Sequence, residues 1–211
     1  MRRLALSTTV RAGWLAALGA VGAWWWRNRE RRPYGPRWLQ ELLPRPALSR
    51  ENLTRLLELR EGDRVLEVGP GYGYYSLSVA RRLAPTGELC LLDINQTTLD
   101  EVIGRACGAG LRNVTARAAD AVALPFDDGV FSAAYLVAVL GELKDGARAV
   151  GELARVLEPG GRLVVGETFA DPHRVPPAHL ARWAQAAGLT FADRTGRVSY
   201  LARYRKPGGS P

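Results

Sequence analysis

Three glycines spaced two residues apart, preceded by an acidic residue, form the most informative motif of the sequence. In Val65-Leu66-Glu67-Val68-Gly69-Pro70-Gly71-Tyr72-Gly73, the glycines directly follow an apolar run. Glycine lets the backbone turn sharply and approach a ligand closely, and a helix that begins next offers free N–H groups. Glu67 interrupts the apolar run, and a buried carboxylate needs a donor or a cation. A ligand with an amino group or a positive charge would supply that partner.

Further acidic residues follow the next apolar segments. Asp93 ends Leu91-Leu92-Asp93-Ile94, 20 residues after Gly73, and Asp120 lies in Ala119-Asp120-Ala121. Two later residues, Glu142 and His173, are candidate general bases, because a histidine titrates near neutrality and a carboxylate accepts a proton. The cysteines, Cys90 and Cys107, lack the clustering that binds zinc or an iron–sulfur cluster. We therefore expect no metal site.

The spacing of apolar residues predicts the elements that position these side chains. Short apolar runs alternate with helical stretches and end in a strand pair joined at Thr195-Gly196. Buried runs of this kind are typical of parallel strands covered on both faces, and the closing pair is typical of a hairpin. We expect an α/β fold with a doubly wound, mostly parallel seven-stranded sheet and an antiparallel edge hairpin. The predicted strands are 64–68, 88–93, 114–117, 131–137, 162–166, 190–194 and 197–206, and the predicted helices are 49–60, 74–83, 96–109, 145–157 and 177–187.

These motifs together resemble the class I S-adenosylmethionine (SAM)-dependent methyltransferases, whose glycine-rich loop reads acid-x-Gly-x-Gly-x-Gly. The resemblance extends over residues 49–206 and includes the segments 124–131 and 155–163. It implies a Rossmann-like fold, SAM as cofactor and methyl transfer. It also implies that Asp93 binds the ribose hydroxyls, that Ile94 packs on the adenine and that Asp120 reads the adenine amino group. The implied cofactor-binding residues are Glu67, Gly69, Gly71, Tyr72, Gly73, Asp93, Ile94, Asp120, Ala121 and Val137.

The acceptor is less constrained than the cofactor. The Asn-Pro-Pro-Tyr signature of methyltransferases that act on nucleic-acid amino groups is absent, and residues 137–142 read VAVLGE in its place. In outline the domain resembles methyltransferases that act on quinone precursors and other small molecules, so we expect a small, lipophilic acceptor. Two alternatives stay open, a catalytically silent SAM-binding regulatory or scaffold protein and an NAD-dependent oxidoreductase. The glycine spacing and Glu67 disfavour the oxidoreductase.

Charge separates the N-terminal segment from the rest of the chain. The 211 residues carry a net charge of +8, with 29 basic and 21 acidic groups. Residues 1–50 hold ten arginines and two acids, whereas the remaining 161 residues hold 19 basic and 19 acidic groups. The predicted folded domain therefore has no excess positive charge, and we expect no nucleic-acid partner.

The N-terminal segment has the composition of a membrane-associating element. Residues 12–26 carry no charge, and five of the six tryptophans lie within the first 38 residues. Indole rings favour the bilayer interface, and the arginines of 27–32 would meet anionic headgroups. We expect residues 4–32 to bind a membrane and the catalytic domain to lie at its cytoplasmic face. A cleaved signal peptide and a helix that packs on the domain or on a second subunit are the alternatives. The layout is then a membrane-associating segment and Pro-rich linker at 1–48, a SAM-binding domain at 49–206 and a flexible tail at 207–211, with the oligomeric state open.

Overall fold

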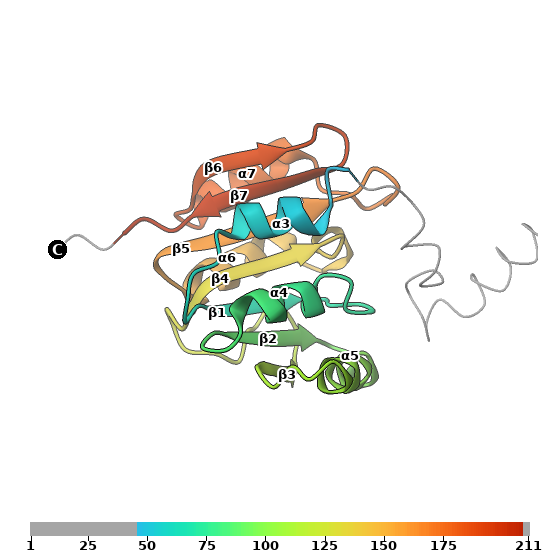
Figure 1. The fold of residues 1–211 in the computed structure, drawn as a ribbon. Helices are drawn as coiled ribbons and strands as arrows, with labels where there is room; N and C mark the ends of the chain where they lie inside the picture. The colour runs from blue at the N-terminus through green and yellow to red at the C-terminus, as the bar shows by residue number, and fades with distance from the viewer. Residues whose placement is uncertain (1–45, 209–211) are drawn as a thin grey trace, which may run out of the picture. The chain divides into compact units, whose positions relative to one another are not determined.

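The computed structural model describes residues 46–208. This part of the chain contains seven strands, five α-helices and one 3-10 helix (Figure 1). The strands are β1 (Arg64–Val68), β2 (Glu88–Asp93), β3 (Val114–Ala118), β4 (Phe131–Val137), β5 (Leu157–Glu167), β6 (Thr190–Thr195) and β7 (Tyr200–Arg205). The helices are α3 (Arg50–Leu57), α4 (Ser76–Leu83), α5 (Gln96–Gly108), η1 (Leu140–Glu142), α6 (Gly146–Val156) and α7 (Pro177–Ala186).

The strands form one sheet in the order β3-β2-β1-β4-β5-β7-β6. The pairs from β3 to β5 are parallel, whereas β7 runs antiparallel to both β5 and β6. Strand β6, at the edge, therefore runs in the same direction as β1 to β5. Strand β7, which lies between β5 and β6, is the one strand of the described sheet that runs in the reverse direction. The predicted fold class is confirmed: a doubly wound, mostly parallel sheet with an antiparallel hairpin at one edge.

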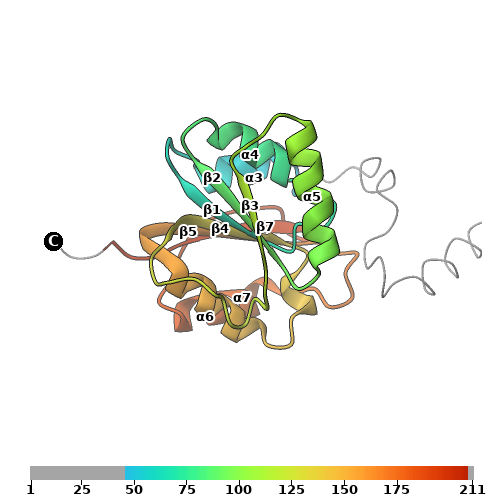
Figure 2. The same ribbon diagram turned by 90° about the horizontal axis from the view of Figure 1, so that it is seen from below.

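Helices cover both faces of the sheet. Figure 2 shows α3, α4 and α5 on one face and α6 and α7 on the other. Neighbouring residues of a strand point to opposite faces, so Val65 packs with the first group of helices and Leu66 with the second. Burial on both faces explains why the central strands read as continuous apolar runs.

Three element boundaries differ from the sequence prediction by three residues or more. Helix α3 ends at Leu57 rather than near Arg60, because Glu58 adopts a left-handed conformation (φ 47°) and forms ion pairs with Arg203 and Arg205. Strand β5 begins at Leu157, and its register shifts by several residues before the pairing of Ala133 with Arg162. Strand β7 begins three residues later than expected, because residues 196–199 form the hairpin loop.

The predicted membrane segment, residues 4–32, lies outside the described residues. Within residues 46–208, the structure has no helix with the length and apolar character that a membrane crossing requires. The membrane association and the cytoplasmic location therefore stay predictions from the sequence.

Candidate cofactor site

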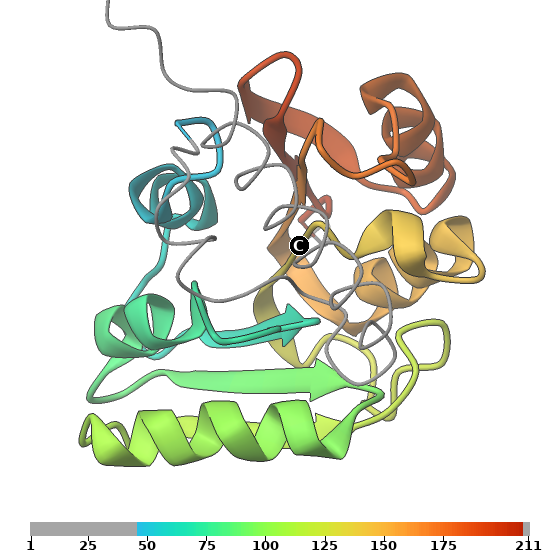
Figure 3. The ribbon, with the colours of Figure 1, turned by 90° about the vertical axis from the view of Figure 1, so that its right-hand side faces the viewer.

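The glycine-rich loop connects β1 to α4 at the carboxyl edge of the sheet, the edge that faces the viewer in Figure 3. Gly69, Gly71 and Gly73 all have positive φ angles, of 67°, 52° and 70°, which glycine adopts without strain. Gly69 N donates to Leu92 O at 2.8 Å, and a Cβ at Gly69 would lie 2.4 Å from Val139 Cγ2. The loop is thus packed between the ends of β2 and β4, and a side chain at position 69 has no room.

Glu67 lies beneath this loop and is 3% exposed. Its Oε2 atom is buried without a hydrogen-bond partner, as are the hydroxyls of Ser76 and Tyr135. Burial raises the pKa of Glu67 to about 7. The nearby hydroxyls of Ser76 and Tyr135 lower this pKa by a smaller amount. Neither hydroxyl forms a hydrogen bond of standard geometry with the carboxyl group. A carboxyl group held this way would gain a partner from the cationic amino group of a ligand. The structure thus shows a buried Glu67 Oε2 without the donor or cation that the sequence predicts it to need, and the role of Glu67 toward a cofactor stays a prediction.

Asp93 ends β2 next to the glycine-rich loop, since its neighbour Leu92 accepts the hydrogen bond from Gly69. Asp93 Oδ1 accepts from Asn95 N at 2.9 Å. Burial raises the pKa of Asp93 despite hydrogen bonds from the backbone of Asn95 and Ile94. Asn95, not Asp93, caps helix α5. Asp93 is half-buried and Ile94 is exposed. Asp93 is therefore not the cap of α5, and the roles of both residues toward the cofactor stay predictions.

The other predicted cofactor residues lie on neighbouring loops. Tyr72 is half-buried in the glycine-rich loop. Val137 ends β4, the neighbour of β1, and the order of the strands along the chain reverses between these two strands. In open α/β sheets, ligands bind at such a switch point. Asp120 is exposed and accepts from Val122 N at 3.1 Å, while Ala121 is buried in the core. Their roles toward the cofactor stay predictions.

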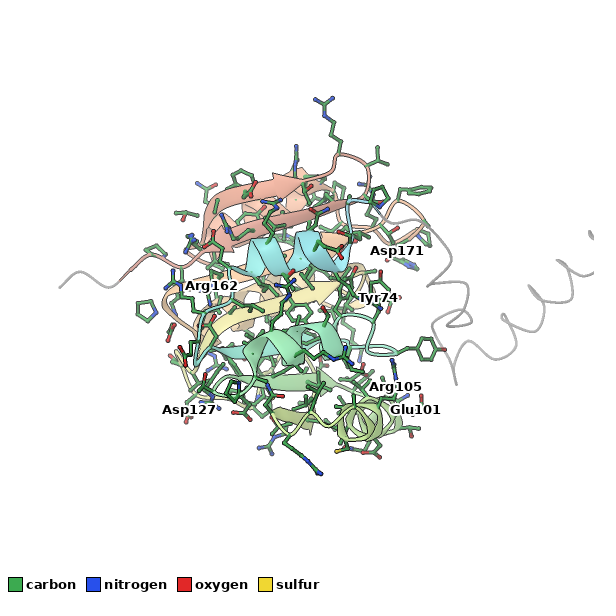
Figure 4. All side chains as sticks on the ribbon, viewed as in Figure 1. Tyr74, Glu101, Arg105, Asp127, Arg162 and Asp171 are labelled. Atoms are coloured by element: carbon green, nitrogen blue, oxygen red, sulfur yellow. The ribbon has the colours of Figure 1, made fainter. Side chains whose placement is uncertain are left out.

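Candidate bases lie on loops after β4 and β5. Burial raises the pKa of Glu142, and the charges of Asp171 and Asp93 add to this while His173 opposes it. His173 is exposed, and its Nδ1 lies 3.7 Å from Asp171 Oδ1. The segment after β4 and the loop after β5 are in close contact: a Cβ at Gly141 would lie only 2.0 Å from His173 O. Both candidates thus lie at the carboxyl edge, where Figure 4 labels Asp171 and Tyr74.

Sequence reasoning missed two hydroxyls of the Glu67 environment. Tyr135 pairs with Glu67 across β1 and β4, and Ser76 is the first residue of α4. Burial raises the pKa of Tyr135 well above its ordinary value, with the charge of Glu67 as the next cause. The sequence offers one sign of this environment, a tyrosine within the apolar run that forms β4. That Tyr135 lies beside Glu67 follows only from the pairing of β1 with β4.

Comparison with known proteins bears on the family of this domain. Residues 66–165 match the family model described as a methyltransferase domain. The ubiquinone/menaquinone biosynthesis C-methyltransferase UbiE of Pseudomonas entomophila is 36% identical over 153 residues, which are 68% of this chain and 58% of the relative. The demethylmenaquinone methyltransferase of Staphylococcus aureus is 31% identical over 56% of this chain and 48% of its own length. The chain thus spans about half the length of these curated relatives.

Solved structures support the same fold. A SAM-dependent methyltransferase from Aquifex aeolicus superposes with a TM-score of 0.66 at 19% identity, covering 76% of this chain and 90% of that one. The [4+2]-cyclase SpnF superposes with a TM-score of 0.68 at 23% identity, over 76% and 80% of the two chains. The family predicted from the sequence is confirmed over residues 66–165, which match a methyltransferase domain. The predicted enzyme class and cofactor agree with the names of the matched proteins, and the activity of this protein is a proposal made below. Over residues 66–165, the chain contains a domain of the methyltransferase family.

Proposed function

We propose that the protein transfers a methyl group from SAM to a small, lipophilic acceptor of the quinone class. The observation that carries the proposal is the buried Glu67 carboxyl with an unpartnered Oε2, placed below three positive-φ glycines and beside the strand that ends at Asp93. The acceptor class is supported by the curated relatives, which are named as ubiquinone, menaquinone and demethylmenaquinone methyltransferases.

The site residues divide the cofactor between them. The Glu67 carboxylate would receive the amino group, and the glycine-rich loop would bring backbone close to the ligand. Asp93 would accept hydrogen bonds from the ribose hydroxyls, with Ile94 against the adenine and Asp120 at its amino group. When bound, SAM supplies an electrophilic methyl group on a sulfonium, and the protein contributes mainly by orienting donor and acceptor.

A carbon acceptor must also lose a proton when the new carbon–carbon bond forms. With SAM bound, the methyl–sulfur bond would break as the acceptor carbon takes the methyl group, and a base of this chain would receive the acceptor's proton. Glu142 and His173 are the bases that we propose for this step. Their position at the carboxyl edge supports the proposal, with Glu142 at the end of η1 and His173 on the loop after β5, and so does the charge of Asp93, which acts on Glu142. The raised pKa of Glu142 favours proton acceptance.

Replacing Asp93 with alanine is expected to weaken binding of S-adenosylhomocysteine by about 1–3 kcal/mol, the usual consequence of losing hydrogen bonds to a charged group. Isothermal titration calorimetry on the full-length protein measures this, with Asp100→Ala on the exposed side of α5 as the control. An unchanged affinity in Asp93→Ala would remove Asp93 from the site, and no heat of binding in the wild type would contradict the proposed function.

Replacing Glu142 with glutamine is expected to lower kcat by about 100-fold or more if it is the base, with S-adenosylhomocysteine affinity unchanged. His173→Gln serves as the parallel variant, because only one of the two needs to accept the proton. The measurement is methyl transfer to a demethylated quinone in detergent micelles. Full activity in both single variants and in the double variant would exclude these residues as bases. Cofactor binding without methyl transfer to any quinone would favour the silent scaffold protein instead.

The location at a membrane belongs to the same proposal. A lipophilic acceptor partitions into a bilayer, and residues 4–32 have the composition to bind one. We place the catalytic domain at the cytoplasmic face on this basis. The NAD-dependent alternative is set aside, because the domain belongs to a family that uses SAM.

A further inference from the structure

We propose that two loops of the catalytic domain form a second membrane-binding surface, specific for anionic lipid, beside the mouth of the cofactor site. The loops are residues 168–176, between β5 and α7, and residues 196–199, between β6 and β7. Both lie at the carboxyl edge of the sheet, on the right in Figure 1. The inference deepens the proposed function and rests on it in one respect, that the acceptor is lipophilic.

The loops present an apolar wedge made of Phe169 and Val198. Phe169 is 71% exposed and Val198 is 63% exposed, and both are among the few large apolar residues that the described chain leaves exposed. A single exposed apolar residue is ordinary, but these two lie on loops that hydrogen bonds join. Phe169 N donates to Ser199 Oγ at 3.1 Å, and Arg174 Nη1 donates to Val198 O at 3.0 Å.

Hydrogen bonds to buried residues anchor the end of the loop that carries Phe169. Tyr200 Oη donates to Val175 O at 2.7 Å, and Val175 N donates to Glu167 Oε2 at 3.3 Å. Val175, Tyr200 and Glu167 are all buried. The aromatic ring of Phe169 is therefore exposed although hydrogen bonds attach its loop to the folded domain.

A basic hollow adjoins the wedge. It has a volume of about 410 Å³, and its charged and titratable lining comes from Lys144, His173, Arg174, His179 and Asp145, with Trp183 as the large aromatic. Arg174 belongs to both features, because it lines the hollow and its guanidinium holds the Val198 loop. The acidic residue of this lining, Asp145, caps α6, where its Oδ1 accepts from Arg148 N at 2.9 Å. Asp171 lies outside the lining, and its Oδ1 accepts from His173 N at 2.8 Å.

This combination fits an anionic bilayer surface. An apolar wedge enters the boundary between headgroups and acyl chains, and adjacent lysine and arginine attract lipid phosphates. Arg197, which is exposed on the same hairpin loop as Val198, adds to the positive side. The carboxyl edge that binds the cofactor would then face the bilayer, so a lipophilic acceptor could enter without crossing water.

Site-specific fluorescence tests the proposal on the full-length chain. In a Cys107→Ser background, where Cys90 is buried, single cysteines replace Phe169 or Val198 and carry an environment-sensitive NBD label. The matched control is Phe191→Cys, because Phe191 is 61% exposed on β6 and lies outside both loops. The label reports local contact with lipid, so any binding by residues 1–45 does not mask the result.

With vesicles of phosphatidylglycerol and phosphatidylcholine, labels at 169 and 198 are expected to shift to shorter wavelength and to be quenched by doxyl lipids, while the label at 191 is not. Lys144→Gln is expected to raise the lipid concentration for half-maximal signal at position 198 about fivefold, and the exposed Arg117→Gln on β3 is expected to leave it unchanged. A signal at 191 equal to that at 169 and 198, or none at either loop, overturns the proposal. Calorimetry with S-adenosylhomocysteine on the same labelled proteins separates this outcome from failure of the proposed function.

Discussion

Replacing Glu67 with glutamine is expected to stabilise the cofactor-free protein above neutral pH and, at the same time, to weaken its binding of S-adenosylhomocysteine. The buried carboxyl group has a pKa raised to about 7, from an ordinary value of 4.5. Burial is the main cause, because Oε2 has no partner in the described structure. Glutamine has nearly the same shape and no charge to bury, and its amide can use the hydroxyls of Ser76 and Tyr135 as acceptors.

The sign of the pH dependence follows from proton linkage. Below the unfolded-state pKa of about 4.5, both states of the wild type carry the proton and the raised pKa costs nothing. As the pH rises from there to about 7, the unfolded state ionises first, so the wild type loses stability. Above pH 7 the deficit reaches its full size, about 3 kcal/mol at most, and stays constant.

Urea unfolding of both proteins between pH 5 and pH 8.5, without cofactor, measures the effect. The difference in unfolding free energy between Glu67→Gln and wild type should grow as the pH rises toward neutrality and then level off. Glu101→Gln, an exposed acid on α5, is the control and should show no such growth. A difference that does not change with pH would mean that Glu67 is not titrating in the folded state.

Ligand binding should change in the opposite direction. If the carboxylate receives the cationic amino group of the cofactor, its loss removes a charge-assisted hydrogen bond worth about 1.5–3 kcal/mol, or roughly tenfold to a hundredfold in affinity. Calorimetry with S-adenosylhomocysteine at pH 8 measures it. A variant that is both more stable and equally able to bind would show that Glu67 is a structural residue with no role toward the ligand.

The strands that position the site were predictable because their signals are local. The runs at 64–68, 88–93 and 131–137 match β1, β2 and β4 residue for residue, since strands buried on both faces leave continuous apolar sequence. The end of α3 was not predictable in this way. Glu58 stops the helix through ion pairs with Arg203 and Arg205 at the far end of the chain, and no local pattern contains that contact.

The same distinction holds within the site. The glycine spacing and Asp93 are local features, and the structure shows the positive φ angles and the strand end that they require. The surroundings of Glu67 depend on the pairing of β1 with β4, although β2 and β3 lie between these two strands in the sequence. The basic hollow likewise combines α6, α7 and the loop between β5 and α7. Residue types and their spacing predicted the candidate cofactor site. The residues that surround it could be identified only once the order of the strands was known.

A buried ion pair at the opposite edge of the sheet gives the largest expected effect on stability. Arg162 Nη2 lies 2.5 Å from Asp63 Oδ2, and both side chains are buried. Asp63 Oδ2 also accepts from Arg60 N at 2.8 Å, and Arg162 Nη1 donates to Glu58 O at 3.3 Å. The pair therefore fastens β5 to the turn between α3 and β1, on the side where Figure 4 labels Arg162.

Replacing Arg162 with methionine is expected to destabilise the protein by about 3–5 kcal/mol, because it leaves the Asp63 carboxylate buried without a cation. Adding Asp63→Leu should recover most of that loss, since an apolar pair of similar volume needs no compensation for buried charge. The control is Arg55→Met, which breaks the exposed pair with Asp193 at 2.8 Å and should cost less than about 1 kcal/mol. Urea unfolding of the single and double variants measures the cycle. Equal losses in Arg162→Met and in the double variant would show that Arg162 acts through packing of its aliphatic stem, and the pairing of charges would then contribute nothing to holding β5 in place.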